Sequence, residues 1–284
     1  MTDLQAPAGE ARTALTVQAG TTHGIGKESV NTLQVVTYNM HKGFSQFQRD
    51  VSVHDLRERL HSLSADVVFL QEVVGSHSRH ARRYGNWPVS PQYEFLADQL
   101  WSSYAYGKNS VYDAGHHGNA ILSKYPIKRW DNEDISMSRL ERRGLLHCEI
   151  EIPGWDRPLH CINVHLGLFG HWRKRQLELL RHRIERLVPR YDPVVIGGDF
   201  NDWRLKASRH LAQILGLQEV FENVHGRPAR TFPSMLPLLH LDRIYTRGFR
   251  VRLAHTHGDR RWARLSDHLA LSALLERTEF NGKQ

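Results

Sequence analysis

The stretch VVIGGDFND, residues 194–202, places an acid and an amide directly after a short apolar run. Asp199 and Asn201 are two positions apart, so on an extended chain they project to the same side. The two glycines before them allow the backbone to turn sharply and to approach a ligand closely. A carboxylate beside an amide suits hydrolysis, because the acid can deprotonate a water and the amide can donate to a phosphoryl oxygen. The alternative is an Asp-x-Asn turn that hydrogen-bonds its own backbone.

Other short apolar runs also end at an acid, an amide or an imidazole. They are Asn39 in LQVVTYN, Glu72 in DVVFLQE, His165 in CINVH, Asp242 in LHLDRIY and Asp267-His268 in LSDHLAL. No single member is specific, but the ordered series indicates a sheet that delivers polar side chains to one edge. The series predicts a divalent-metal phosphoesterase site.

The residue types suggest a division of roles within this series. Glu72 is the best metal ligand, with Asp267 and the amide of Asn39, and an oxygen set without cysteine favours Mg²⁺ or Mn²⁺ over zinc. Asp242 is the natural partner for an imidazole. For Asp267-His268 two interpretations stay open, an acid that orients an imidazole elsewhere, or an acid on the metal beside a phosphate-binding histidine. His165 is an acid, a phosphate ligand or a buried structural histidine.

The net charge, the cysteines and the lengths of the apolar runs limit the kinds of partner and compartment that we expect. The chain has 284 residues and a formal net charge of +8, which favours an anionic partner such as nucleic acid, a phosphorylated metabolite or an acidic membrane surface. A solvated basic surface explains the charge equally well. Cys148 and Cys161 lack metal-ligand spacing, so we expect buried free thiols and a reducing cytoplasm. No apolar run approaches the roughly 20 residues that span a bilayer.

Residues 1–30 read as a disordered tail and residues 31–278 as a single domain. Strand patterns occupy 33–38, 67–71, 119–123, 144–151, 158–165, 193–197, 241–246 and 268–274. Helical patterns occupy 53–63, 93–101 and 171–188. The arginines of the last helix, Arg173, Arg175, Arg183 and Arg186, are interpreted mainly as a solvated face. The turn at 153–157 predicts a hairpin, and segments 75–92 and 225–240 read as long surface loops.

With these residues in place the chain resembles the endonuclease/exonuclease/phosphatase superfamily, which includes DNase I. The resemblance rests on TYNMHKG at 37–43, LQEV at 70–73, HGNAILSK at 117–124, NVHLG at 163–167, GGDFND at 197–202, LDRIY at 241–245 and SDHLALS at 266–272. It is strongest to a bacterial subfamily without a firmly assigned substrate. It implies an α/β (α+β) four-layer sandwich, with two packed mixed β-sheets flanked by helices and the active site at one end.

The resemblance also implies residue roles. Glu72, Asn39 and Asp267 would hold the metal, and Asp199 would activate the attacking water. Asn201, His165 and His268 would contact the phosphate, with His268 oriented by Asp242. His41 stands where abasic-site endonucleases of the superfamily carry a second acid, which weakens a two-metal proposal and suggests a phosphate contact.

The leading prediction is a Mg²⁺-dependent phosphodiesterase acting on DNA or RNA, monomeric and cytoplasmic. Substrate-binding candidates are His41, Lys42, Asn119, Arg142 and Asn163, with Arg143, Arg173, Trp172, Trp203 and Phe232 as further contacts. The alternative keeps the chemistry and changes the substrate to a phospholipid or a phosphorylated small molecule. Loop 225–240 would then meet a membrane, although a hydrophobic plug that closes the sandwich is the preferred interpretation of that loop.

Overall fold

The computed structural model describes residues 29–45 and 50–278, and the predicted tail lies outside this part up to residue 28. The described strands are Thr32–Asn39 (β1), Val67–His77 (β2), Ser103–Tyr112 (β3), Gly115–Ser123 (β4), Ile127–Asp134 (β5), Gly144–Ile150 (β6), Leu159–His165 (β7), Val194–Asp199 (β8), Gln218–Glu219 (β9), Asp242–Arg247 (β10), Phe249–His257 (β11) and Ala270–Arg277 (β12). The helices are Val53–Leu63 (α1), Ser78–Arg83 (α2), Gln92–Ala97 (α3), Gly170–Leu187 (α4), Lys206–Leu215 (α5) and Val220–His225 (α6), with 3-10 turns at His41–Gly43 (η1) and Trp262–Arg264 (η3).

These strands form two six-stranded sheets with the same central plan. The first has the order β11-β12-β1-β2-β4-β3 and the second the order β5-β6-β7-β8-β10-β9. Each centres on a parallel pair, β1 with β2 and β7 with β8, flanked by antiparallel strands. Helices α1 and α4 make the two parallel crossovers. The carboxyl ends of β1, β2, β7 and β8 therefore meet the amino ends of β10 and β12 at one edge.

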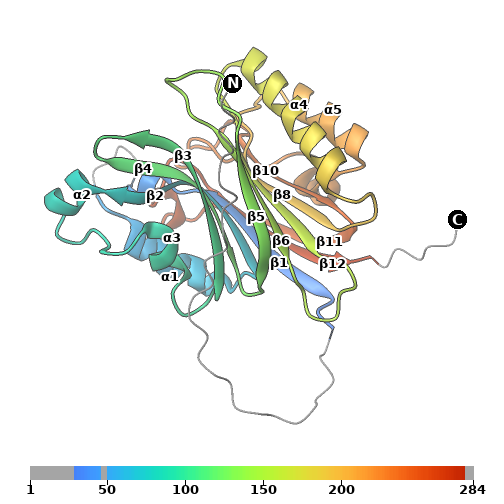
Figure 1. Ribbon diagram of the computed structural model, residues 1–284, viewed down its shortest axis with the longest axis horizontal. Helices are drawn as coiled ribbons and strands as arrows, with labels where there is room; N and C mark the ends of the chain where they lie inside the picture. Colours follow the sequence, from blue (N-terminus) through green and yellow to red (C-terminus); the bar gives the residue numbers. More distant parts are fainter. Residues whose placement is uncertain (1–28, 46–49, 279–284) are drawn as a thin grey trace, which may run out of the picture.

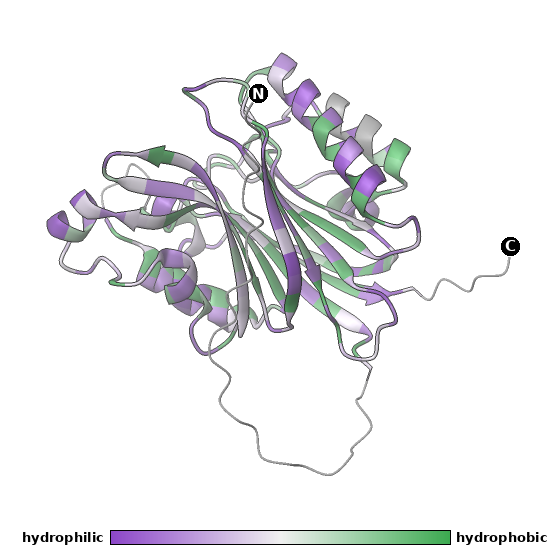
Figure 2. Cartoon of the chain, viewed as in Figure 1, coloured by the Kyte–Doolittle hydropathy of each residue, from purple (hydrophilic) through white to green (hydrophobic). Residues whose placement is uncertain are grey.

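Three apolar layers hold the sandwich together. Side chains of both sheets, such as Phe69 and Val195, fill the central layer. A second layer joins the first sheet to α1 and α3, and a third joins the second sheet to α4 and α5. Figure 1 shows these helices on opposite outer sides of the two sheets, and Figure 2 shows hydrophobic residues running along the central strands. The four-layer sandwich of two mixed sheets is confirmed.

Several local expectations need correction. The pattern at 93–101 forms a helix only over Gln92–Ala97, and segment 75–92 contains the end of β2 and all of α2. Strands β3, β5 and β11 were not expected. The hairpin of β6 and β7 around 153–157 and the two buried free cysteines are confirmed.

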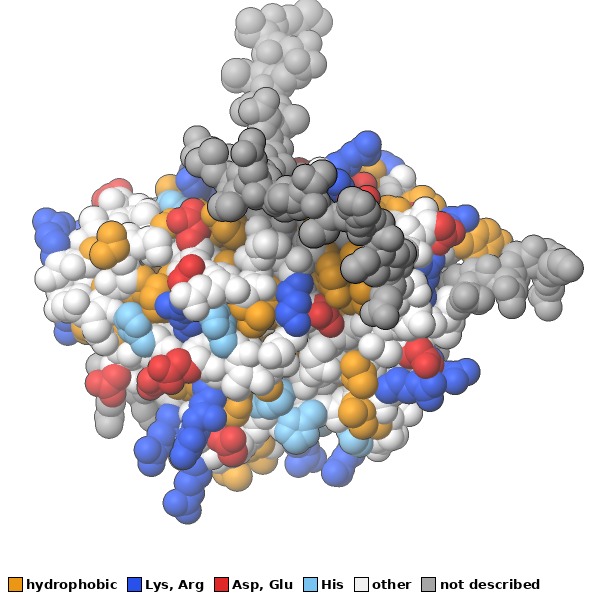
Figure 3. Space-filling model, turned by 90° about the horizontal axis from the view of Figure 1, so that it is seen from below, with side chains coloured by type: hydrophobic (Ala, Val, Ile, Leu, Met, Phe, Trp, Pro, Cys, Tyr) orange, Lys and Arg blue, Asp and Glu red, His pale blue; other side chains and the backbone are white. Residues whose placement is uncertain are grey.

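The prediction that four arginines of α4 form a solvated face is wrong for two of them. Arg173 and Arg183 are buried. Arg183 pairs with Asp131 and Glu133, at 2.6 Å in each case, and so ties the helix to β5. Arg175 and Arg186 are exposed as expected. On the face seen from below in Figure 3, basic and acidic side chains are interspersed, so the net positive charge forms no single basic patch there.

Candidate active site

The register of the parallel pairs brings polar residues of both sheets together. Asn39 pairs with Gln71 in the first sheet, so Glu72 lies one residue beyond it. In the second sheet Asp199 lies between His165 and Asp242, its register partners on the two neighbouring strands. The Asn39 Nδ2 donates to Asp199 Oδ2 at 3.2 Å and joins the two groups across the sandwich. The predicted strand-end residues thus gather at one edge.

Asp199 stands at the centre of this group and is buried. Its Oδ1 accepts the backbone N–H of Asn201 at 2.9 Å, which is the local turn considered above. Its Oδ2 lies 3.5 Å from His165 Nε2 and 3.9 Å from His268 Nε2. Burial raises the pKa of the carboxyl, although the charge of His268 acts in the opposite direction. One oxygen therefore builds the turn and the other faces the site.

The glycines before Asp199 serve the sheets rather than a ligand. A Cβ on Gly197 would lie 2.8 Å from the Phe69 ring of the facing sheet. A Cβ on Gly198, whose φ is +151°, would lie 2.0 Å from the Val164 carbonyl oxygen of β7. The expectation that they allow a ligand to approach is therefore wrong, because both positions are closed by the protein itself.

The second acid, Asp242, is the partner of His268. Its Oδ2 accepts from His268 Nδ1 at 2.8 Å, and both side chains are buried. Burial alone would lower the pKa of His268, but the carboxylates of Asp242 and Asp199 raise it to about 10. His268 is therefore an imidazolium held between two carboxylates. The neighbouring His165 is neutral instead, since burial and the positive charges of Arg143 and His268 keep its pKa well below its usual value.

The other half of the site carries carboxylates of the first sheet. Glu72 lies in a bulge of β2 between Leu70 and Val73, with a φ of 57°, and its Oε2 lies 3.7 Å from Lys42 Nζ. Burial acts to raise the pKa of Glu72, but the charges of Lys42 and His41 outweigh it and the pKa is lowered. Asp267, in the loop before β12, has its Oδ1 3.4 Å from His41 Nδ1.

Backbone strain concentrates at this edge. Of the seven non-glycine residues with positive φ in the described chain, four belong to the site: His41, Lys42, Glu72 and Asn201. Such conformations cost about 1–3 kcal/mol each and persist only where the surroundings impose them. They support a functional interpretation of this edge, since it combines strain, buried charge and partly exposed carboxylates.

The side chains of Asp199, Asp242 and His268 also form a compact group of ligand atoms, all within 4.8 Å of one another. The 2.8 Å hydrogen bond from His268 Nδ1 to Asp242 leaves Nε2 of the ring as the atom that could face an ion, as in many metal-binding histidines. A group that includes an imidazole suits zinc better than Mg²⁺, which prefers oxygen ligands. The donors that fit Mg²⁺ are the oxygens of Glu72, Asp267 and Asn39, because this ion takes one or two carboxylates and few dedicated ligands.

Two predicted substrate ligands are buried inside the protein. Asn163 donates through Nδ2 to the carbonyls of Leu70 and Ala120 at 2.8 Å each, and its Oδ1 accepts from Gln71 at 2.8 Å. Asn119 donates to the Gly144 carbonyl at 3.0 Å. Neither side chain has exposed surface. The prediction is wrong for both, because they satisfy backbone and side-chain groups between the sheets.

The structure separates the two neighbouring arginines that were predicted as substrate contacts, Arg142 and Arg143. The Arg142 guanidinium is exposed and 3.4 Å from Asp134. Its neighbour Arg143 donates through Nε to the Leu166 carbonyl, next to His165, and its charge acts on Asp199. Arg143 is therefore the arginine of the site. His117 was not predicted as a site residue: burial and Lys42 lower its pKa to about 4, and it interacts with the charge of Glu72.

Of the further contacts, Arg173 is buried and donates to the carbonyls of Gly167 and Leu168, so its predicted role on substrate is wrong. Phe232 lies beside the catalytic group, with its ring centroid 5.0 Å from that of His268. No signal in the sequence separated these two cases, because burial depends on the fold of the following loops.

Comparisons with known proteins identify the family of this chain. Residues 36–268 match the model of the endonuclease/exonuclease/phosphatase family. The uncharacterized protein YbhP of Escherichia coli strain K12 is 47% identical over 242 residues, which cover 85% of this chain and 95% of that protein.

Among solved structures, an endonuclease/exonuclease/phosphatase from Beutenbergia cavernae is similar with a TM-score of 0.69 at 19% identity, covering 87% of this chain and 72% of that one. D. rerio TDP2, solved with a single-strand DNA product, is similar with a TM-score of 0.61 at 18% identity, covering 86% and 99%. The chain belongs to the endonuclease/exonuclease/phosphatase family.

Proposed function

We propose that this chain is a divalent-metal-dependent hydrolase of phosphate diesters. The observation that carries the proposal is the buried arrangement of Asp242, His268 and Asp199 opposite His165, at the edge where both sheets deliver polar side chains. Membership of a family of phosphoesterases supports the same class of reaction.

The roles follow from charge and distance. Asp199 is the general base: it is buried, its pKa is raised, and Oδ2 points toward the two imidazoles. It takes the proton of the attacking water as the oxygen of that water bonds to phosphorus, while the opposite P–O ester bond breaks and the leaving alcohol oxygen takes a proton from solvent. His268, kept cationic by Asp242, neutralises charge that develops on the phosphoryl oxygens, and Asn201 and neutral His165 orient the phosphate by hydrogen bonds.

Glu72, Asp267 and Asn39 would hold the metal, for which we propose Mg²⁺, with Mn²⁺ as the substitute. When bound, the ion would polarise a phosphoryl oxygen as a Lewis acid. Lys42 and His41 lie beside these carboxylates and are placed to contact the phosphate. His41 remains the candidate phosphate contact at the position where a second acid is absent.

Two substrate classes contain the required diester. Nucleic acid is supported by the net charge of +8 and by the structural similarity to a TDP2 that was solved with a DNA product. Phospholipid is supported by an observation that nucleic acid does not explain. Loop 225–240 exposes large aliphatic side chains, so the preferred interpretation of that loop as a buried plug is wrong, and its Phe232 ring contacts the His268 ring.

The test is a panel of plasmid DNA, single-stranded RNA, phosphatidylglycerol and inositol phosphates, each assayed with Mg²⁺ or with EDTA. We expect hydrolysis of at least one diester with Mg²⁺ and none with EDTA. Glu72→Gln should raise the Mg²⁺ concentration for half-maximal activity, whereas the exposed Glu58→Gln on α1 should not change it. Undiminished hydrolysis in EDTA would refute the metal-dependent mechanism.

A further inference from the structure

The loop between α6 and β10 ends in an apolar tip. Met235, Leu236 and Leu238 retain 59%, 65% and 55% of their surface, and Leu239 is exposed as well. Four neighbouring aliphatic side chains in water carry a free-energy cost that a soluble surface normally avoids. Such a tip indicates an apolar partner.

The tip stands on a closed, hydrogen-bonded base. The backbone N–H groups of Leu238 and Leu239 donate to the Phe232 carbonyl at 2.9 and 2.8 Å, and the Thr231 N–H donates to the Leu239 carbonyl at 2.9 Å. Residues 231–239 thus form a short bridged hairpin. The exposure of the tip follows from this built shape and not from an absence of local structure.

The same hairpin is fixed to the catalytic segment. Ser234 donates through its N–H to the Asp267 carbonyl at 2.8 Å, and through Oγ to the carbonyls of Ala263 and Ser266 at 2.8 and 2.7 Å. The Phe232 ring contacts the His268 ring. The apolar tip therefore stands on the rim of the active site.

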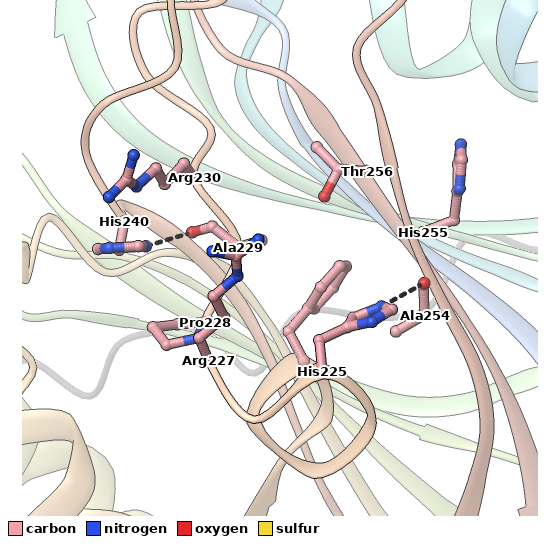
Figure 4. A pocket seen from close by; sticks show the side chains of 10 residues that line it. His225, Arg227, Pro228, Ala229, Arg230, His240, Ala254, His255 and Thr256 are labelled. Carbon is pink, nitrogen blue, oxygen red and sulfur yellow. Dashed lines mark hydrogen bonds between the residues drawn. The ribbon is translucent and has the colours of Figure 1, made fainter.

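A basic cavity lies at the root of the hairpin. It has a volume of about 730 Å³ and is lined by Arg227, Arg230, His240, His225 and His255 among others. Figure 4 shows Arg230 and His240 on one side and His255 across the opening on β11. Among the described residues, no carboxylate forms an ion pair with Arg227 or Arg230, although many other arginines have one. The cavity therefore suits an anionic group.

Other loops at this edge also expose large apolar side chains. Leu168 and Phe169, shortly after His165, and Trp203, two residues after Asn201, are exposed large apolar side chains. A polar catalytic centre is thus bordered by apolar tips from several loops. This pattern fits a surface that presents a phosphate above an apolar layer.

We propose that the hairpin 231–239 docks the protein on a bilayer that contains anionic phospholipids. Its tip enters the acyl-chain boundary, and Arg227 and Arg230 contact headgroup phosphates, a combination of apolar and electrostatic binding. The inference rests on the proposed function and assigns the phospholipid diester as its substrate class. Nucleic acid is disfavoured as the occupant, because single strands are bound by aromatic stacking in basic grooves and not by aliphatic tips.

The test is co-sedimentation of the full chain with vesicles of phosphatidylcholine alone or mixed equally with phosphatidylglycerol. We expect binding to the mixed vesicles and weaker binding to the neutral ones. Leu236→Gln/Leu238→Gln should reduce the partition coefficient by about tenfold or more, and Arg227→Ala/Arg230→Ala by on the order of tenfold on mixed vesicles only. Leu187→Gln and Arg186→Ala, exposed changes on α4, are the matched controls and should bind like the wild type.

Wild-type protein that stays in solution with mixed vesicles would overturn the proposal, and so would unchanged sedimentation of the Leu236→Gln/Leu238→Gln variant. Loss of oligonucleotide binding in the arginine variant, without vesicle binding by the wild type, would assign the surface to nucleic acid instead. Hydrolysis of the soluble diester bis(p-nitrophenyl) phosphate tests the proposed diesterase function separately from docking on the membrane. Vesicle binding without any diesterase activity would refute the proposed function and leave the docking surface standing.

Discussion

Replacing Asn163 by alanine should destabilise the protein and loosen the metal side of the site. Asn163 makes three buried hydrogen bonds of 2.8 Å, two to the carbonyls of Leu70 and Ala120 and one from Gln71. Leu70 and Gln71 lie at the bulge of β2 from which Glu72 projects, and Ala120 lies on the neighbouring strand β4. The side chain therefore supports a strained segment of one sheet from the neighbouring sheet.

The magnitude follows from those three bonds. A buried polar group left without its partner costs about 1–3 kcal/mol, so the free energy of unfolding should fall by about 3–5 kcal/mol. For a domain of this size that corresponds to a drop of about 10 °C in Tm. Because the bulge positions Glu72, the Mg²⁺ concentration for half-maximal activity should also rise.

Urea unfolding followed by circular dichroism measures the first effect, and Mg²⁺ titration of activity measures the second. Asn223→Ala, an exposed amide on α6 bonded only to Gln218 among the described residues, is the control and should change stability by less than about 0.5 kcal/mol. A loss below about 1 kcal/mol for Asn163→Ala, with unchanged Mg²⁺ response, would refute the reasoning.

Three further predictions address the site, a buried acid and the α4 helix. Asp242→Asn should lower kcat/KM for a phosphodiester by about 10²- to 10⁴-fold, because His268 loses the carboxylate that orients it and keeps it cationic. Steady-state kinetics would measure this loss, and circular dichroism should show that the fold is retained. Near-normal activity of the variant would contradict the assigned role of Asp242. Burial raises the pKa of Glu219 to about 7, above 4.5 in the unfolded chain, so the folded state retains a proton that the unfolded state releases and stability falls as pH rises between these values. Glu219→Gln should therefore match the wild type below pH 4.5 and exceed it by about 3 kcal/mol above pH 7 in urea unfolding, and parallel pH curves would show that the acid is not perturbed. Arg183→Met should cost about 2 kcal/mol in thermal unfolding because it removes the guanidinium that pairs with Asp131 and Glu133, whereas exposed Arg186→Met should cost nothing measurable; equal effects would argue against the burial of Arg183.

The central strands could be predicted from the sequence, and the edge strands could not. β1, β2, β7 and β8 lie inside the sheets and read as continuous apolar runs. The unexpected strands β3, β5 and β11 lie at the outer edges of the two sheets. Edge strands carry charged and polar residues that prevent pairing with other chains, so their apolar signal is weak.

The grouping of the polar residues at the strand ends was predictable for a related reason. A polar residue directly after a buried strand has few places to go except the sheet edge, and this located Asp199, Asp242 and His268 together. The same rule failed for Asn163, because it lies two positions before the end of β7, on the same face as His165 but deeper between the sheets, where it is buried against the first sheet. The choice between Arg142 and Arg143 also depended on a loop conformation that alternation does not determine.

Whether loop 225–240 contacts a membrane depends on the exposure of its side chains, which the sequence pattern does not determine. The sequence around Pro233 and Pro237 suits a buried plug as well as an exposed tip. Only the hydrogen bonds at the base of the hairpin show which groups are fixed and which side chains remain outside. Among the described residues no helix is long and apolar enough to cross a bilayer, and the proposed contact with lipid is made by a loop.

Hydrolysis of bis(p-nitrophenyl) phosphate by the wild type and by Asp199→Asn, in Mg²⁺ and in EDTA, tests the central claim most directly. The account predicts Mg²⁺-dependent turnover in the wild type and a loss of at least about a hundredfold in the variant, because an amide cannot take the proton of the attacking water. Unfolding curves should coincide within about 1 kcal/mol. Full activity of a folded Asp199→Asn protein would contradict the assignment of Asp199 as the base.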